Sequence, residues 1–133
     1  MEPIIEFKNT EQAIGCLKEW QDRLALNEWI IKVYFAAPHE FKLKGVMGEC
    51  EYDNVNKCAV ISIMKPEFYG DRIMKYCAEL TLVHELLHCK LGLLAIDDGY
   101  NNLLHQTQED IAKAFIMAKY GISREWFSDI SYE

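Results

Sequence analysis

The sequence ELTLVHELLH at 79–88 decides how this chain is organised, because it sets two histidines four residues apart in an apolar run that predicts a helix. Residues at that spacing stand one above the other on a helix face, so the imidazoles of His84 and His88 can reach a single metal ion. Glu85 lies beside that face. In the pattern H-E-x-x-H such a glutamate takes a proton from a metal-bound water, which makes Glu85 the candidate general base.

The residues around the motif favour a packed helix. Apolar side chains recur there at steps of three and four, at Leu80, Val83, Leu87, Leu91 and Leu94. This spacing is typical of an amphipathic helix with one side on a core. His84 and His88 fall with Thr81 on another side, where a site would have to be. The alternative, an accidental or purely structural motif, is disfavoured by this context.

The composition favours one folded domain covering 1–133. The chain has 133 residues and 50% hydrophobic content, which is enough for one core and too little for two. No stretch approaches the roughly 20 apolar residues of a membrane helix, and the acidic start is no signal peptide. We therefore expect a soluble cytoplasmic protein with no membrane partner. The sequence does not predict an oligomeric state.

The charge and the cysteines disfavour several classes of protein. The net charge of -7 argues against nucleic acid as a partner, because a grip on phosphates needs a clustered basic face. The five cysteines include no C-x-x-C pair, which is unlike a zinc ribbon or a disulfide framework and suits a reducing compartment. Cys89 directly follows His88 but points about 100° away on a helix, so we interpret it as a packing residue rather than a metal ligand.

Periodicity and turn residues predict an α+β fold. The expected elements are an N-terminal helix at 9–27, a strand at 29–35, a β-hairpin of 46–53 and 57–64, a central helix from Asp71 to near Gly92, and a second helix at 103–120. The residues at 97–99 indicate a loop between the two later helices. Gly121 is expected to end the last helix, and the tail with Trp126 and Phe127 is expected to fold back onto the domain.

The second strand of the hairpin, 57–64, is the candidate for peptide binding. It alternates apolar and mixed positions, which gives the sheet one apolar face. If this strand lies at the sheet edge, its unpaired amides and carbonyls can hold an extended peptide by strand addition. An ordinary edge covered by a loop is the alternative.

A catalytic zinc site needs three protein ligands and one open position, so a residue outside the motif must complete it. The second predicted helix offers Glu109 and His105, which stand one turn apart and can face the same cleft. A third histidine in the pattern H-E-x-x-H-x-x-G-x-x-H is missing, because Leu91 and Leu94 occupy the glycine and histidine positions. The residues by themselves leave both donors open.

The H-E-x-x-H motif is followed by a run E-x-x-A-x-x-F, which Glu109, Ala112 and Phe115 match. Together these two motifs resemble those of the minimal gluzincin-type zinc metallopeptidases. That family includes the ImmA/IrrE-like group and small phage and bacterial members. The resemblance implies a zincin-like fold, in which a small sheet with a hairpin packs with an N-terminal helix, an H-E-x-x-H helix and a following glutamate helix. It also implies a Zn²⁺ ion held by His84, His88 and Glu109, and a protein or peptide substrate.

One departure from that family concerns the support of the first histidine. Larger gluzincins carry an aspartate four residues after the ligand glutamate, whereas this chain has Lys113 there. The hydrogen-bond acceptor for His84 must then come from Asp97, Asp98 or Asp110, or from a backbone carbonyl.

The combined prediction is a zinc metallopeptidase in which Glu85 activates water and returns its proton to the leaving amine. The developing oxyanion needs a further donor, for which His105 and Tyr100 are the candidates, with ordinary surface roles as the alternatives. Two other classes stay open, a catalytically weak zinc scaffold with a regulatory role and a SprT-like DNA-associated protease. The last class uses a histidine as the third ligand, a place that His105 could fill.

Overall fold

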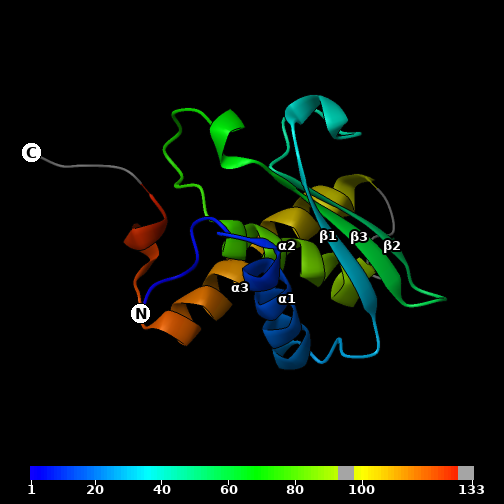
Figure 1. Ribbon diagram of the computed structural model, residues 1–133. Coiled ribbons are helices and arrows are strands. Elements are labelled where there is room, and N and C mark those ends of the chain that lie inside the picture. Colours follow the sequence, from blue (N-terminus) through cyan, green and yellow to red (C-terminus); the bar gives the residue numbers. More distant parts are fainter. Residues whose placement is uncertain (93–97, 129–133) are drawn as a thin grey trace, which may run out of the picture.

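A mixed sheet of three strands forms one layer of the molecule (Figure 1). The computed structural model describes residues 1–92 and 98–128, and within them the strands are β1 (Ile30–Ala36), β2 (Gly48–Asp53) and β3 (Cys58–Met64). Their order in the sheet is β1, β3, β2, with β1 parallel to β3 and β2 antiparallel to it. These bounds confirm the predicted strand and hairpin to within a few residues.

The turn of the hairpin is built from local hydrogen bonds. Asp53 Oδ1 accepts from the backbone amides of Val55 at 2.9 Å and Asn56 at 3.1 Å. Such Asx turns stabilise a chain reversal without help from distant residues. Lys57 then takes a φ of 53°, the left-handed conformation that completes the reversal. The turn sets the register in which Asp53 lies opposite Cys58.

The position of β3 in the sheet differs from the expectation. β3 is the central strand, bonded on both sides, so the prediction that 57–64 is an edge able to take a peptide is wrong. The alternation did identify the buried face, since Ile61 and Ile63 are fully buried. Alternation reports which face of a strand is apolar, but it does not report which strands flank it. The parallel partner β1 joins β3 across a long sequence separation, which no local pattern records.

α1 (Thr10–Arg23) begins at the predicted capping signal. The Oδ1 atom of Asn9 accepts from the Gln12 amide at 2.8 Å, which satisfies a backbone donor of the first turn. The helix ends at Arg23 and not near Asn27, because Ala25 takes a left-handed φ of 56°. The predicted helix is therefore confirmed with an earlier end.

α2 (Ala78–Leu91) carries the motif but does not begin at Asp71 as predicted. The preceding segment is held by a distant part of the chain, since the Lys75 amide donates to the Phe127 carbonyl at 2.7 Å. A backbone donor bonded there cannot also bond within a helix, so the helix starts after this segment. The predicted end near Gly92 is confirmed.

α3 (Asp98–Tyr120) starts earlier than the predicted residue 103. Its first residues, Gly99 among them, were predicted as loop and belong to the helix, while Asp97 lies outside the described residues. The predicted end is confirmed, because Gly121 takes a φ of 65° directly after the last turn.

The tail folds back as predicted, as far as Ser128. A short 3-10 helix covers Arg124–Phe127, and the Phe127 side chain is buried. Its ring joins the main core, which gives the tail an apolar reason to dock.

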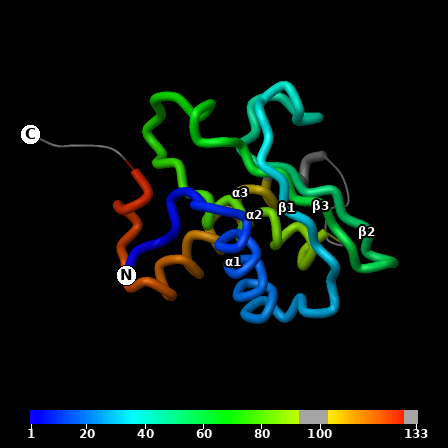
Figure 2. The backbone as a smooth tube through the Cα atoms, in the orientation of Figure 1, coloured from blue at the N-terminus to red at the C-terminus, as the bar shows by residue number. Residues whose placement is uncertain are grey.

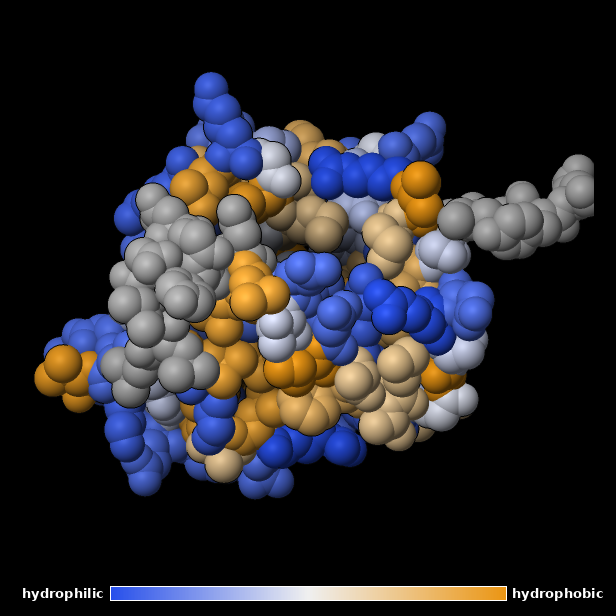
Figure 3. Space-filling model, turned by 180° about the vertical axis from the view of Figure 1, so that it is seen from behind, coloured by the Kyte–Doolittle hydropathy of each residue, from blue (hydrophilic) through white to orange (hydrophobic). Residues whose placement is uncertain are grey.

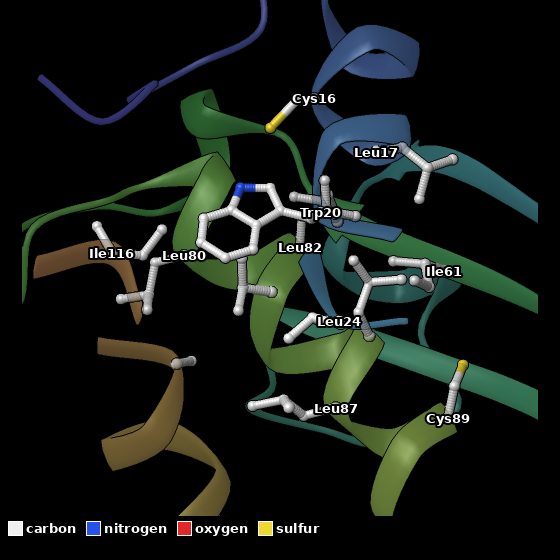
Figure 4. Close-up of a cluster of buried hydrophobic side chains, with 14 of the residues drawn as sticks. Cys16, Leu17, Trp20, Leu24, Ile61, Leu80, Leu82, Leu87, Cys89 and Ile116 are labelled. Atoms are coloured by element: carbon white, nitrogen blue, oxygen red, sulfur yellow. The ribbon is translucent and has the colours of Figure 1, made fainter. Parts of the chain in front are cut away.

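α2 is the centre of the packing, because it contacts the sheet, α1 and α3. In Figure 4 the indole of Trp20, from α1, lies among side chains of the neighbouring elements, with Leu80 and Leu82 of α2 and Ile116 of α3 close by. Each large apolar side chain buried in this way contributes roughly 1.5–3 kcal/mol. The core therefore fixes α2 on several sides at once.

The buried carboxylate of Glu79, in the first turn of α2, forms hydrogen bonds with the N-terminal segment, α1 and α3. In Figure 2 the N-terminal segment passes the start of α2. Its Oε1 atom accepts from the Ile4 amide at 2.9 Å and the Tyr120 hydroxyl at 2.6 Å. Its Oε2 atom accepts from Trp20 Nε1 at 2.8 Å and Lys119 Nζ at 2.9 Å. The charge is thus neutralised by a cation and fully hydrogen-bonded, as a buried carboxylate requires.

Replacing Glu79 with glutamine should destabilise the fold strongly. The amide removes the charge that neutralises Lys119 and directs donors toward groups that are donors themselves, so we expect the free energy of unfolding to fall by about 3–5 kcal/mol. Urea unfolding followed by circular dichroism measures the loss. The control is Glu19→Gln, since Glu19 also pairs with Lys119 but its side chain is 40% exposed; it should cost less than about 1 kcal/mol. Equal losses would contradict the role given to Glu79.

Candidate metal centre

Three imidazoles converge between α2 and α3. His84 and His88 lie on α2, and His105 lies on α3. One nitrogen from each ring lies within 4.8 Å of the others, and the ring centroids are 4.8 to 5.6 Å apart. Zinc–nitrogen bonds of about 2.0–2.1 Å put two ligand nitrogens within about 4 Å of each other. Small side-chain rotations would therefore let the three rings share one ion.

The packing of α2 explains why the motif histidines face the site. Leu80, Val83 and Leu87 are buried and Leu91 is partly buried, which confirms the predicted packed side as far as it is described, while Leu94 lies outside the described residues. The side chains of His84 and His88 keep 16% and 18% of their surface exposed, so they lie on the strip that the core leaves uncovered. The local periodicity thus selects which residues can meet a metal ion.

Glu109 lies against His84, one turn along α3 from His105. Its Oε1 atom is 3.6 Å from His84 Nδ1, a buried nitrogen that has no hydrogen-bond partner among the described residues. Burial lowers the pKa of His84, but the Glu109 carboxylate, together with the charge of Glu85, outweighs this effect and raises the pKa. A carboxylate at Nδ1 holds the proton there and leaves Nε2 free for a metal.

The structure places Glu109 and His105 of α3 differently from what their predicted roles suggest. The prediction took Glu109 as the third ligand and His105 as a donor for the oxyanion. His105 is instead grouped with the motif histidines, and Glu109 is placed beside His84. Glu109 still lines the same cleft, so its ligand role stays a prediction.

The other predicted acceptors for His84 do not reach it in the described part of the chain. Asp110 points elsewhere, since its Oδ1 lies 3.6 Å from Arg124 on the surface. The side chains of Asp97, Asp98 and Tyr100 lie outside the described residues. The nearest acceptor that the structure places beside His84 Nδ1 is therefore Glu109, which the prediction had assigned to the metal itself.

Glu85 lies beside the histidines in a nearly water-free position, with 5% of its surface exposed. Its Oε1 atom is 3.6 Å from His88 Nε2. Burial raises the pKa of Glu85 to about 7. The charge of His84 acts to lower this pKa, and the charges of Glu109 and Glu49 act to raise it. A carboxyl group that titrates near neutral pH suits proton transfer to and from water.

Gly48, the first residue of β2, lies directly over Glu85. A Cβ atom at this position would lie 2.8 Å from Glu85 Oε2 and 2.7 Å from Thr81 Cγ2. Only glycine therefore lets the strand come this close to the helix. Gly48 was not among the predicted site residues, although it lies inside the predicted strand 46–53, where a glycine is a recognised signal of close backbone approach.

His88 is held from the side by an aromatic ring that the sequence analysis also missed. The Tyr52 ring of β2 stacks on the imidazole at a centroid distance of 6.4 Å and an interplanar angle of 18°. A Cβ atom at Gly92 would lie 2.6 Å from the same ring, so Gly92 makes room for it. Burial, followed by the charges of His105 and His84, lowers the pKa of His88 to about 4. His88 is thus neutral at physiological pH, the form that binds metals.

Cys89 packs inside the protein as predicted. It is buried, and its Sγ lies 3.9 Å from Sγ of Cys50 on β2. It is not grouped with the three histidines among the described residues.

A cleft of about 390 Å³ opens onto His84 and His105. Its walls come from the chain at 45–48, from the segment at 72–77, and from the facing sides of α2 and α3. The face in Figure 3 is hollowed near its centre, and hydrophilic side chains border the hollow. A substrate segment can therefore enter beside the imidazoles without any movement of the core.

Comparisons with known proteins leave the interpretation to the residues themselves. The chain matches no protein-family model, no curated protein and no solved structure. The resemblance to gluzincin-type metallopeptidases thus stays a prediction from its motifs. In the described part of the chain, no helix has both the length and the apolar character that a membrane crossing needs.

Replacing Gly48 with alanine should disturb the site specifically. The added methyl group overlaps Glu85 and Thr81, so we expect β2 to shift outward and the free energy of unfolding to fall by about 1–3 kcal/mol. Gly15→Ala is the matched control. No atom lies within 4 Å of a Cβ there, and α1 should gain roughly 0.5–1 kcal/mol. Urea unfolding of both variants measures the difference, and a neutral Gly48→Ala would contradict the close approach.

Proposed function

We propose that this protein is a zinc-dependent metallopeptidase with a zincin-like fold. The observation that carries the proposal is the convergence of His84, His88 and His105 beside the buried Glu85. Three nitrogen donors next to a carboxylate match a catalytic zinc site, in which the fourth position is left for water. In this proposal His105 is the third ligand and Glu109 is the hydrogen-bond acceptor that orients His84.

The chemistry of the donors fits zinc. His84 Nδ1 is buried and lacks a hydrogen bond, which a small movement of Glu109 would supply. The lowered pKa values of His88 and His105 favour neutral rings, because burial and the neighbouring imidazoles disfavour a second charge. Neutral imidazoles and a nearby carboxylate are the usual surroundings of a zinc ion in a hydrolase.

In peptide hydrolysis the residues of the site would have different roles. Zinc bound at the three histidines would acidify a coordinated water and polarise the peptide carbonyl. Glu85 would take the proton from the attacking water, which its raised pKa of about 7 allows, and pass it to the leaving amine. The burial of Glu85 keeps bulk water from competing for that proton.

The free edge of β2 supports a place for the substrate backbone. The Met64 amide donates to the Met47 carbonyl at 2.8 Å, and bonded and outward-facing residues alternate along an antiparallel ladder. The backbone groups of Gly48 and Cys50 therefore point away from β3, and no strand of the described residues pairs with that side. Since Gly48 lies over Glu85, an extended peptide bonded to this edge would bring a carbonyl near the base.

The third ligand can be tested by zinc affinity in single variants. We expect His105→Ala to weaken zinc binding by more than roughly 100-fold, because it removes a ligand, and Glu109→Ala to weaken it by roughly 10–100-fold. Competition with a chromophoric chelator measures both. His39→Ala, an exposed histidine outside the cluster, is the control and should change nothing. If Glu109→Ala empties the site and His105→Ala does not, the gluzincin ligand set is right and the assignment made here is wrong.

The role of Glu85 can be tested with the isosteric variant Glu85→Gln. We expect zinc content and fold to be retained while peptide hydrolysis falls by roughly 10²–10⁴-fold, because the amide cannot accept the proton. Cleavage of a mixed peptide library, followed by mass spectrometry, measures the rate, and metal analysis measures the zinc. Loss of zinc in this variant would contradict the role as base. A wild-type protein that binds zinc but cleaves nothing would favour the zinc-scaffold class.

A further inference from the structure

Three cations border the cleft beside the histidines. Lys113 extends the wall formed by α3, and Arg72 and Lys75 come from the segment that faces it. The cleft also contains the carboxylates of Glu85 and Glu109, which lie against the imidazoles. Lys113 follows Glu109 by one turn of α3, and the charges of the two side chains interact. The positive end of the cleft, formed by Arg72, Lys75 and Lys113, therefore adjoins its metal-binding end, in a chain whose net charge is -7.

In the described part of the chain these three cations form no ion pair, although the charge of Lys113 interacts with that of Glu109. Ion pairs elsewhere in the structure use other basic residues, namely Arg23, Lys42, Lys57, Lys119 and Arg124. Within residues 1–92 and 98–128, no carboxylate lies at ion-pair distance from Arg72, Lys75 or Lys113. A cation without a counter-ion beside a cleft is free to bind an anionic ligand.

Aromatic rings hold the three cations in place instead. Arg72 lies 4.7 Å from the centre of the Tyr69 ring, and Lys75 lies 4.3 Å from the Trp126 ring. Lys113 lies 5.9 Å from the Phe127 ring. A ring face stabilises a cation without cancelling its charge. The contacts therefore limit the motion of the side chains without cancelling their charge. Arg72 and Lys75 border the cleft and also a neighbouring hollow that Tyr69 lines.

The backbone that carries two of these cations is also tied down. The Lys75 amide donates to the Phe127 carbonyl at 2.7 Å, and Met74 forms a β-bridge with Ser128. The folded-back tail thus supplies the rings beside Lys75 and Lys113 and the backbone contacts at Met74 and Lys75, whereas the ring beside Arg72 is Tyr69 of its own segment. This gives the docking of the tail a consequence for the cleft.

The spacing along α3 sets the distance between the metal-binding end and the positive end. His105, Glu109 and Lys113 follow at steps of four residues, so they share one helix face. Eight residues of helix cover about 12 Å. An extended peptide covers that distance in roughly three to four residues.

We infer that the cleft selects acidic peptides, with aspartate or glutamate side chains about three to four residues from the bond that is cleaved. The inference rests on the proposed function for the choice of a peptide, and on the unpaired cations for its charge. Carboxylates match both guanidinium and ammonium donors. A nucleic acid fits less well, because binding its regularly spaced phosphates needs a longer basic face than three residues in one cleft.

The test measures peptide binding without turnover, using zinc-loaded protein that carries Glu85→Gln. Three fluorescein-labelled ten-residue peptides differ only in having four glutamates, four glutamines or four lysines among alanines. Fluorescence anisotropy should give a dissociation constant about tenfold lower for the glutamate peptide than for the glutamine peptide, equivalent to about 1.4 kcal/mol. The preference should shrink as salt rises from 0.05 to 0.5 M, since screening weakens charge pairs. Equal affinities for the glutamate and glutamine peptides overturn the inference.

Charge-matched variants assign the effect to the cleft. The triple variant Arg72→Gln, Lys75→Gln, Lys113→Gln should lose the preference for glutamate. The control variant Lys8→Gln, Lys18→Gln, Lys32→Gln removes the same charge from exposed positions away from the cleft and should keep it. Equal loss in both variants overturns the inference. If circular dichroism indicates that the cleft triple is misfolded, Lys113→Gln alone should still reduce the preference about threefold, and no reduction overturns the inference.

The outcomes separate this inference from the proposed function. Preferential binding of the glutamate peptide by a wild-type protein that cleaves nothing supports the acidic cleft ligand and contradicts the peptidase activity. Cleavage of all three peptides at similar rates with equal binding supports the activity and overturns the acidic selection. Displacement of the glutamate peptide by a ten-residue oligothymidylate at equal concentration overturns the inference in favour of a phosphate ligand.

Discussion

The carboxylate of Glu79 is the buried charge on which the arrangement of the helices depends. It is fully buried, and its four donors come from the N-terminal segment, α1 and α3. Water cannot replace a lost partner at such a position, so the donors must all be in place together. The network therefore fixes where α2 begins and how α3 lies against it. His84 and His88 follow Glu79 on α2, and His105 lies near the start of α3, whereas Lys119 and Tyr120 lie at its end. The hydrogen bonds of Glu79 therefore help to set the distance between the two helices that supply the site.

The site adds a second constraint, which acts through backbone rather than charge. Gly48 lets β2 approach α2 until the strand covers Glu85, and Tyr52 of the same strand stacks on His88. The close strand removes water from Glu85 and raises its pKa to about 7, because the charged form loses solvation. One strand thus excludes solvent from the candidate base, supports one histidine and leaves an open edge beside both. These features depend on one another, since a strand further away would lose all of them.

Local patterns predict most of the site and less of the fold. His84, Glu85 and His88 follow from spacing on one helix, and Leu80, Val83 and Leu87 follow from the same period. Local patterns do not predict the central position of β3, because its parallel partner β1 lies far away in the sequence. They also do not predict the late start of α2, because the segment before it is bonded to the distant Phe127 carbonyl. The choice between His105 and Glu109 is also non-local. Both residues share a helix face and both lie beside the motif histidines, so the spacing along α3 does not decide which of them would bind a metal.

The charge distribution at the cleft differs from that of the whole chain, and the proposed selectivity for acidic peptides depends on this difference. A chain with a net charge of -7 repels an acidic peptide over most of its surface, and this repulsion acts within about 10 Å at 0.1 M salt. The cations Arg72, Lys75 and Lys113, which form no ion pair with a described residue, place positive charge beside the cleft. An acidic peptide would therefore gain attraction at the cleft and lose it elsewhere, so charge would favour productive orientation more than overall affinity. The carboxylates of Glu85 and Glu109 near the imidazoles act against this attraction, and a divalent metal held beside them would offset their charge.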